Sequence, residues 1–150
     1  MKKSLLLGLA AAAVSTVAVA QDLSAPATYG TATLETGFTP DPTTVSVVAG
    51  GTLAAPGGCV GKVANAPDYE LTYTAGTTFP LNIYVKSDSD TTLAINGPDG
   101  SWHCADDSNG VNPAVTFTSP ASGVYDIFVG TYGDTPAPAT LHISELAPQW

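Results

Sequence analysis

The chain has 150 residues and is strongly acidic, with 13 Asp and Glu against 4 Lys and Arg and a formal net charge of −9. This length allows one domain with a sizeable core. Two of the four basic residues lie at positions 2 and 3, and removing their two positive charges brings −9 to −11 for the rest. Such a surface repels phosphate groups, which argues against nucleic acid and anionic membranes as partners.

Residues 1–20 have the pattern of a secretory signal peptide. Two lysines form the charged start, an apolar stretch follows, and Ala18-Val19-Ala20 is a small-residue cleavage site before Gln21. The apolar stretch is short for a membrane span, and no charged stop follows it. We therefore expect a secreted or periplasmic protein with no transmembrane helix. Residues 21–27 are small and Pro-rich and are expected to form a flexible leader.

The remainder of the chain has the pattern of short β-strands. Thr, Val, Gly and Pro are plentiful, and apolar residues do not recur at helical spacing. Strands are expected at residues 28–35, 43–49, 69–74, 81–86, 91–95, 101–105, 114–118, 124–132 and 139–144. Short alternating strands separated by Gly and Pro turns are typical of antiparallel sandwiches. We predict an all-β antiparallel sandwich of about eight or nine strands over residues 28–146, with a short tail at 147–150.

Cys59 and Cys104 are the only two cysteines of the chain. In an exported protein such a pair is expected to form a disulfide. Because the loop it closes is long, the chain-entropy model gives a stabilisation of roughly 4 kcal/mol.

The stretch 88–113 is rich in oxygen-bearing side chains. Its candidate metal ligands are Asp88, Asp90, Asp99, Asp106, Asp107, Asn109 and Asn112. Calcium takes six to eight oxygen ligands and tolerates irregular geometry, although the spacing here is not that of an EF-hand. The alternative is that these residues serve turns and solubility, since Asp and Asn favour turns. Adjacent Asp106 and Asp107 repel each other unless a cation or hydrogen-bond donors relieve them, so they are the best functional candidates.

Signals for catalysis are weak. The chain has no Gly-x-Ser-x-Gly, no HExxH and no CxxC, so we expect no catalytic residue. One alternative is a small secreted serine-type peptidase, in which Ser108 and His103 would be nucleophile and base. Another is a carbohydrate- or matrix-binding module that uses exposed Tyr84, Trp102 and Tyr132.

One family resemblance covers nearly the whole chain after residue 20. Its densest part runs Asp90-Thr91-Thr92-Leu93, Pro98-Asp99-Gly100-x-Trp102-x-Cys104, Asp106-Asp107, Asn112-Pro113, Ser122-Gly123-x-Tyr125 and Val129-Gly130-Thr131-Tyr132. This string resembles the bacterial pre-peptidase C-terminal domain, in a stand-alone secreted version often labelled peptidase by association.

The resemblance implies a jelly-roll-like β-sandwich without catalytic activity. In some relatives this domain is calcium-stabilised or collagen-binding, and the peptidase domain lies elsewhere in the chain. We therefore expect a non-catalytic binding or accessory module whose partner is an extracellular protein or polysaccharide, with calcium as its expected ion. Among the motif residues, Tyr125 is expected to bond backbone at a corner, and Trp102 to pack in the core or over the disulfide.

Overall fold

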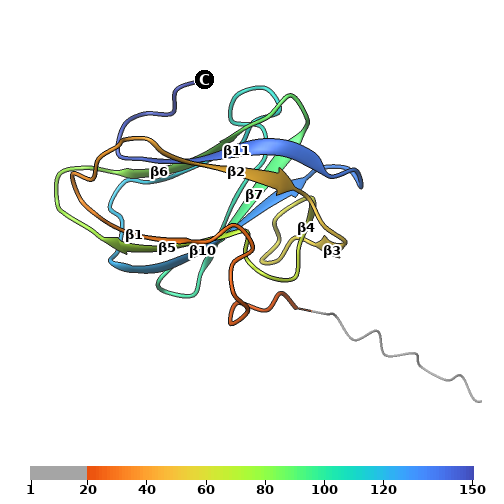
Figure 1. Cartoon of the computed structure of the whole chain (residues 1–150), viewed down its shortest axis with the longest axis horizontal. Coiled ribbons are helices and arrows are strands. Elements are labelled where there is room, and N and C mark those ends of the chain that lie inside the picture. The colour runs from red at the N-terminus through yellow and green to blue at the C-terminus, as the bar shows by residue number, and fades with distance from the viewer. Residues whose placement is uncertain (1–19) are drawn as a thin grey trace, which may run out of the picture.

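A computed structural model describes residues 20–150 as two stacked β-sheets (Figure 1). The expected signal peptide therefore lies almost entirely outside the described residues. The strands are β1 (Thr31–Glu35), β2 (Thr43–Ala49), β3 (Leu53–Ala54), β4 (Lys62–Val63), β5 (Tyr69–Thr74), β6 (Leu81–Lys86), β7 (Thr91–Asn96), β8 (Trp102–Ala105), β9 (Ala114–Phe117), β10 (Gly123–Thr131) and β11 (Ala137–Ser144). No helix in this part of the chain is long and apolar enough to cross a membrane.

The two sheets have different organisations. One has the order β2-β11-β6-β9 and is antiparallel. The other is built around β10, which pairs with β5 over its first half and with β7 over its second half. Strand β8 continues this sheet beyond β7, and the β3–β4 hairpin contacts the end of β10. The predicted antiparallel sandwich is confirmed, with one difference: β1 joins β5 in parallel.

The core lies between the sheets because strand alternation turns one apolar face of each toward the other. On β6, Leu81, Ile83 and Val85 are fully buried. They belong to the same core cluster as Ile127 on β10 and Leu141 on β11. All nine predicted strands are present within two or three residues of their expected bounds. Strands β3 and β4 were not predicted, because two residues each are too few to show alternation.

A second, smaller cluster covers the outer face of the β10 sheet. Phe128 is fully buried there beside Ala94 and Val63, although its neighbours on β10 face the main core. The segment before β4 folds over it and is tied to β8 by the predicted Cys59–Cys104 disulfide, which is confirmed. Trp102 packs on Phe128, with ring centroids 5.7 Å apart. Trp102 was expected to pack in the core or over the disulfide, and it packs against the smaller buried cluster, which Cys59 also contacts.

The turns of the motif also have the expected structural roles. The hydroxyl of Tyr125 donates a 2.7 Å hydrogen bond to the carbonyl of Ala121, at the corner before β10. Gly100 closes the β7–β8 hairpin with a hydrogen bond of 2.9 Å from its N–H to the Gly97 carbonyl. Gly123, which begins β10, has φ +144°, and a Cβ there would lie 2.6 Å from Cβ of Pro98. The start of β10 therefore requires glycine.

Candidate functional site

The register of the β7–β8 hairpin brings three aspartates together. Leu93 on β7 lies opposite Ala105 on β8. Because the strands are antiparallel, the residues after Ala105 lie beside those that precede Leu93. One carboxylate oxygen each from Asp90, Asp106 and Asp107 lies within 4.8 Å of the other two. We call these three residues the acidic cluster.

The acidic cluster is electrostatically strained. Asp90 and Asp107 are exposed, whereas Asp106 is half-buried. Oδ1 of Asp106 is buried without a hydrogen-bond partner in the described part of the chain. Burial first, and then the charges of Asp107 and Asp90, raise the pKa of the Asp106 carboxyl above its ordinary value. A bound cation would act in the opposite sense, because an opposite charge favours the ionised carboxylate.

The three carboxylates of the acidic cluster are close enough together to hold a metal ion. Calcium binds carboxylate oxygens at 2.3–2.6 Å. Two oxygens on the same ion are therefore at most about 5 Å apart, and the cluster meets this limit. Three carboxylates also supply several of the six to eight oxygens that calcium takes, with water for the remainder.

Asp99 does not join the acidic cluster. It lies in the turn at the other end of the β7–β8 hairpin, where its Oδ1 accepts a 3.0 Å hydrogen bond from the N–H of Ser101. Strand β7 has six residues, so at about 3.3 Å per residue its two ends are roughly 20 Å apart. The expectation that Asp99 shares a site with Asp90 is thereby corrected.

The remaining predicted ligands also have other positions. Oδ1 of Asn112 accepts a 2.9 Å hydrogen bond from the N–H of Ser87. Asn109 forms an isolated β-bridge with Asn112 through backbone atoms and is itself exposed. Asp88 lines a groove together with Asn112 and is not part of the acidic cluster. The sequence pattern did not separate these residues from the cluster because they are neighbours along the chain.

The three predicted aromatic ligand-binding residues have very different exposures. Tyr132 is 61% exposed, and Trp102 is half-buried against Phe128. Tyr84 is only 1% exposed, which corrects its expected role as a surface contact. Its ring stacks on His142, with centroids 4.6 Å apart, so His142 packs against an aromatic ring on this face.

The tail after β11 is what covers Tyr84. It crosses the outer face of the β2-β11-β6-β9 sheet, above β6 in Figure 1. The side-chain amide of Asn82 donates a 2.8 Å hydrogen bond to the Leu146 carbonyl, and Lys86 Nζ donates one of 3.1 Å to the Gln149 carbonyl. Trp150 then meets Tyr84 edge to face, with ring centroids 5.4 Å apart.

The structure does not bring Ser108 and His103 together as a nucleophile and base. The Ser108 hydroxyl donates to the carbonyl of Ala114 at 3.2 Å and accepts from its N–H at 2.8 Å, so it closes a loop. His103 lies opposite Ile95 on the hairpin and meets Phe117 edge to face at 4.7 Å. In the described residues, each of the two side chains therefore contacts a group other than its supposed catalytic partner.

Three buried carboxyl groups were missed in the sequence, those of Asp68, Asp126 and Glu145, and the pKa of the first two is raised. Asp68, just before β5, is 2% exposed, and burial raises its pKa to about 7 although the Val129 N–H donates to its Oδ2 at 2.7 Å. Asp126 on β10 is 9% exposed, and burial and the charge of Glu70 raise its pKa. On β10, alternation with the core residues Tyr125 and Ile127 places Asp126 on the outer face of its sheet. The sequence did not show that other segments cover that face.

Comparison with protein-family models and with curated proteins finds no match. Among solved structures, the chain is similar to a periplasmic lysozyme inhibitor of g-type lysozyme, PliG from Aeromonas hydrophila. The identity is 15% and the TM-score 0.46, over 77% of this chain and 96% of that one.

Proposed function

We propose that the protein is an exported, non-catalytic binding module whose acidic cluster is occupied and stabilised by a calcium ion. The observation that carries the proposal is the convergence of Asp90, Asp106 and Asp107 to within 4.8 Å while Oδ1 of Asp106 is buried without a donor. An ion there would reduce the repulsion among the three carboxylates, and it would give Oδ1 of Asp106 the partner that this atom lacks.

Export is supported by the disulfide, because such bonds form and persist in oxidising compartments. The absence of a catalytic role is proposed because Ser108 and His103 each have structural partners of their own. The calcium ion would hold the end of the β7–β8 hairpin rather than take part in a reaction.

A thermal melt in excess chelator and then in millimolar calcium tests the proposal. A ligand that binds only the folded state stabilises it by about 2.7 kcal/mol at a hundredfold excess over Kd. We expect an upward shift of several degrees in Tm. The shift should disappear in Asp106→Asn and Asp107→Asn.

Asp99→Asn is the matched control. This aspartate lies in the same hairpin but at its other end, and asparagine can still accept the hydrogen bond from Ser101. The control variant should respond to calcium as the native protein does. A native protein whose Tm and heat of titration are unaffected by calcium would overturn the calcium proposal.

A further inference from the structure

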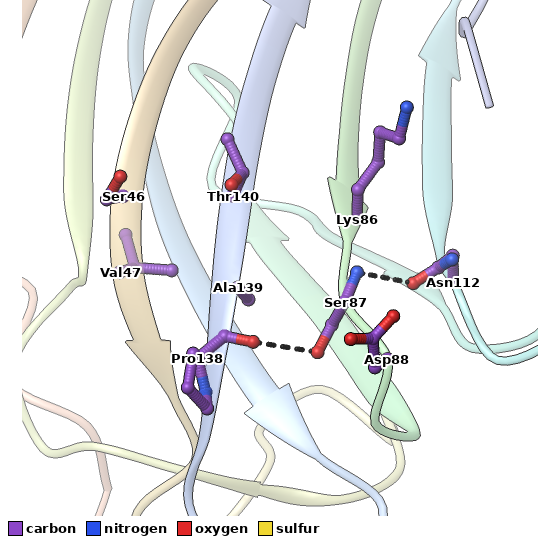
Figure 2. Close-up of a pocket in the computed structure, with 9 residues that line it drawn as sticks. All are labelled: Ser46, Val47, Lys86, Ser87, Asp88, Asn112, Pro138, Ala139 and Thr140. Carbon is purple, nitrogen blue, oxygen red and sulfur yellow. Dashed lines mark hydrogen bonds between the residues drawn. The ribbon is translucent and has the colours of Figure 1, made fainter.

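A polar groove of about 510 Å³ lies on the outer face of the β2-β11-β6 sheet (Figure 2). Ser46, Thr140 and Lys86 are paired neighbours in one row across these three strands. They face away from the core because the next residue on β11, Leu141, is fully buried. Asp88 and Asn112 extend the groove beyond the end of β6.

The groove exists because β6 and β11 diverge at this point. Their pairing ends at Lys86 and Thr140. Beyond that pair, the Ser87 hydroxyl instead donates a 2.8 Å hydrogen bond to the Pro138 carbonyl, and the Ser87 N–H donates to Asn112. Side-chain hydrogen bonds of Ser87 and Asn112 therefore replace the strand pairing at this point and form one edge of the groove.

Several polar groups in the groove form no hydrogen bond with the other lining residues and are available to a ligand. Figure 2 shows two hydrogen bonds among the lining residues, and both involve Ser87. The Asp88 carboxylate and the hydroxyls of Ser46 and Thr140 take part in neither. Asn112 uses its carbonyl oxygen for Ser87, which leaves its amide N–H groups as donors.

The mixture of charges selects a neutral ligand rich in hydroxyl groups. An anion would be repelled by Asp88, and a metal cation by Lys86. A hydroxyl group donates and accepts, so it satisfies the Asp88 carboxylate and the Asn112 amide with the same chemistry. Exposed Pro138 also lines the groove and offers an apolar surface. A sugar ring has these polar edges together with an apolar face.

Trp150 lies next to the groove. The Lys86 ammonium contacts the carbonyl of Gln149, the preceding residue. The Trp150 ring sits over Tyr84, which is two residues from Lys86 on β6, or about 7 Å along the strand. Trp150 remains 45% exposed, so it has indole surface on which a second sugar ring can stack.

From these contacts we propose that the groove and Trp150 together bind a neutral oligosaccharide. This inference rests on the proposed function as a binding module and assigns its ligand class. The sugar hydroxyls bond to Asp88, Asn112 and Thr140 in the groove, and an adjoining ring stacks on Trp150. The proposed site is distinct from the calcium site, which lies at the end of the β7–β8 hairpin.

Tryptophan fluorescence provides a direct test, because the chain has only Trp102 and Trp150. In a Trp102→Phe background Trp150 is the sole reporter. Titration with cellohexaose, chitohexaose, maltohexaose and xylohexaose should change its emission for at least one sugar, and calorimetry should give the Kd. Asp88→Ala and Thr140→Val should each weaken binding about tenfold or more. The matched control is Thr72→Val, on the outer face of the other sheet, and it should leave Kd unchanged.

Three results would overturn the oligosaccharide site. The first is that cooperatively melting protein binds none of the four sugars. The second is that Asp88→Ala and Thr140→Val leave the sugar Kd unchanged. The third is that the protein is retained on collagen and binds no sugar. Each titration is run with calcium and with chelator. If calcium does not raise the Tm of the native protein but the sugar binds, only the calcium proposal is contradicted. If calcium raises the Tm but no sugar binds, only the oligosaccharide site is contradicted.

Discussion

The hydroxyl of Tyr73 donates a 2.6 Å hydrogen bond to Oε1 of Glu145 and thereby joins the two sheets at one end of the sandwich. Tyr73 is on β5, and Glu145 follows directly after β11. Both side chains are buried, and Oε2 of Glu145 accepts a second bond, of 2.8 Å, from the N–H of Gly37. Burial raises the pKa of Tyr73 to about 12, and the Glu145 carboxylate is the second cause of this increase.

Tyr73→Phe should therefore lower the free energy of unfolding by about 1–3 kcal/mol, because Glu145 loses a donor in a buried position. Urea denaturation of both proteins at pH 7 measures the difference. Tyr29→Phe is a suitable control, because the Tyr29 hydroxyl accepts its 3.1 Å hydrogen bond from the exposed N–H of Val48. An equal loss in the two variants would show that burial of the Tyr73–Glu145 pair has no special effect.

Asp68 should make the protein less stable at neutral pH than at mildly acidic pH. Its pKa is about 7 in the folded state against 3.8 for the ordinary group, so the folded state binds more protons between these values. The free energy of unfolding then falls as the pH rises from about 4 to about 7, by about 1.4 kcal/mol per pH unit at most.

Asp68→Asn removes this titration while keeping an oxygen that accepts from Val129. Urea denaturation over pH 4–8 should show that the variant gains stability relative to the native protein as the pH rises. The difference in free energy of unfolding between the variant and the native protein is followed at each pH. The raised pKa of Asp126 affects both proteins alike and cancels in this difference. A constant difference across this range would contradict the prediction.

The disulfide should contribute roughly 4 kcal/mol, since Cys59 and Cys104 are 45 residues apart. It also holds the segment that covers Phe128, so its loss should loosen the smaller cluster first. We expect Cys59→Ser/Cys104→Ser to lower Tm by many degrees and to increase hydrogen exchange in β4 and β8 more than in β6. Uniform exchange in all three strands would show that the effect lies in the unfolded chain.

Gly123→Ala should be strongly destabilising. Its φ of +144° is unfavourable for alanine, and the added Cβ would overlap Pro98. We expect a loss of at least about 1–3 kcal/mol. Gly133→Ala is the control, because nothing lies within 4 Å of its added Cβ. Thermal melts of the two variants should differ clearly, and similar Tm values would contradict the proposed constraint at the start of β10.

Removal of the Trp150 ring should raise the pKa of His142. Burial first, and then the charge of Lys86, lower this pKa in the folded protein. Trp150 covers Tyr84, on which His142 stacks, so Trp150→Ala admits water to the pair. Titration of the His142 ring by NMR measures the change. Trp102→Phe, which lies on the other sheet, should leave the His142 pKa as it is in the native protein.

The strand pattern could be predicted because each long strand carries its own alternation. Leu81, Ile83 and Val85 face the core in the structure as their spacing indicates. The β7–β8 turn could also be predicted, since Pro98-Asp99-Gly100 has the local preferences of a tight turn. The pairing of β1 with β5 could not, because a parallel neighbour is chosen by the packing of the whole sheet.

The candidate sites were less predictable. The composition of residues 88–113 indicated an oxygen-rich region, but seven ligands were expected and the hairpin register unites three. The aromatic prediction was least accurate. Tyr84 alternates with core residues, a pattern that predicts an exposed side chain. In the structure the C-terminal tail covers Tyr84, and Trp150 lies at the surface instead.

The amino-acid sequence is sufficient for the all-β class, most strand positions, the disulfide and the acidic character, because these depend on local alternation, residue type and cysteine count. Tertiary structure decides which aspartates converge, which carboxyl groups are buried and where the groove lies. These features depend on register and on segments far apart in the chain, such as Asp90 beside Asp106 and Trp150 over Tyr84. Contacts of this kind leave no periodic signal in a single sequence.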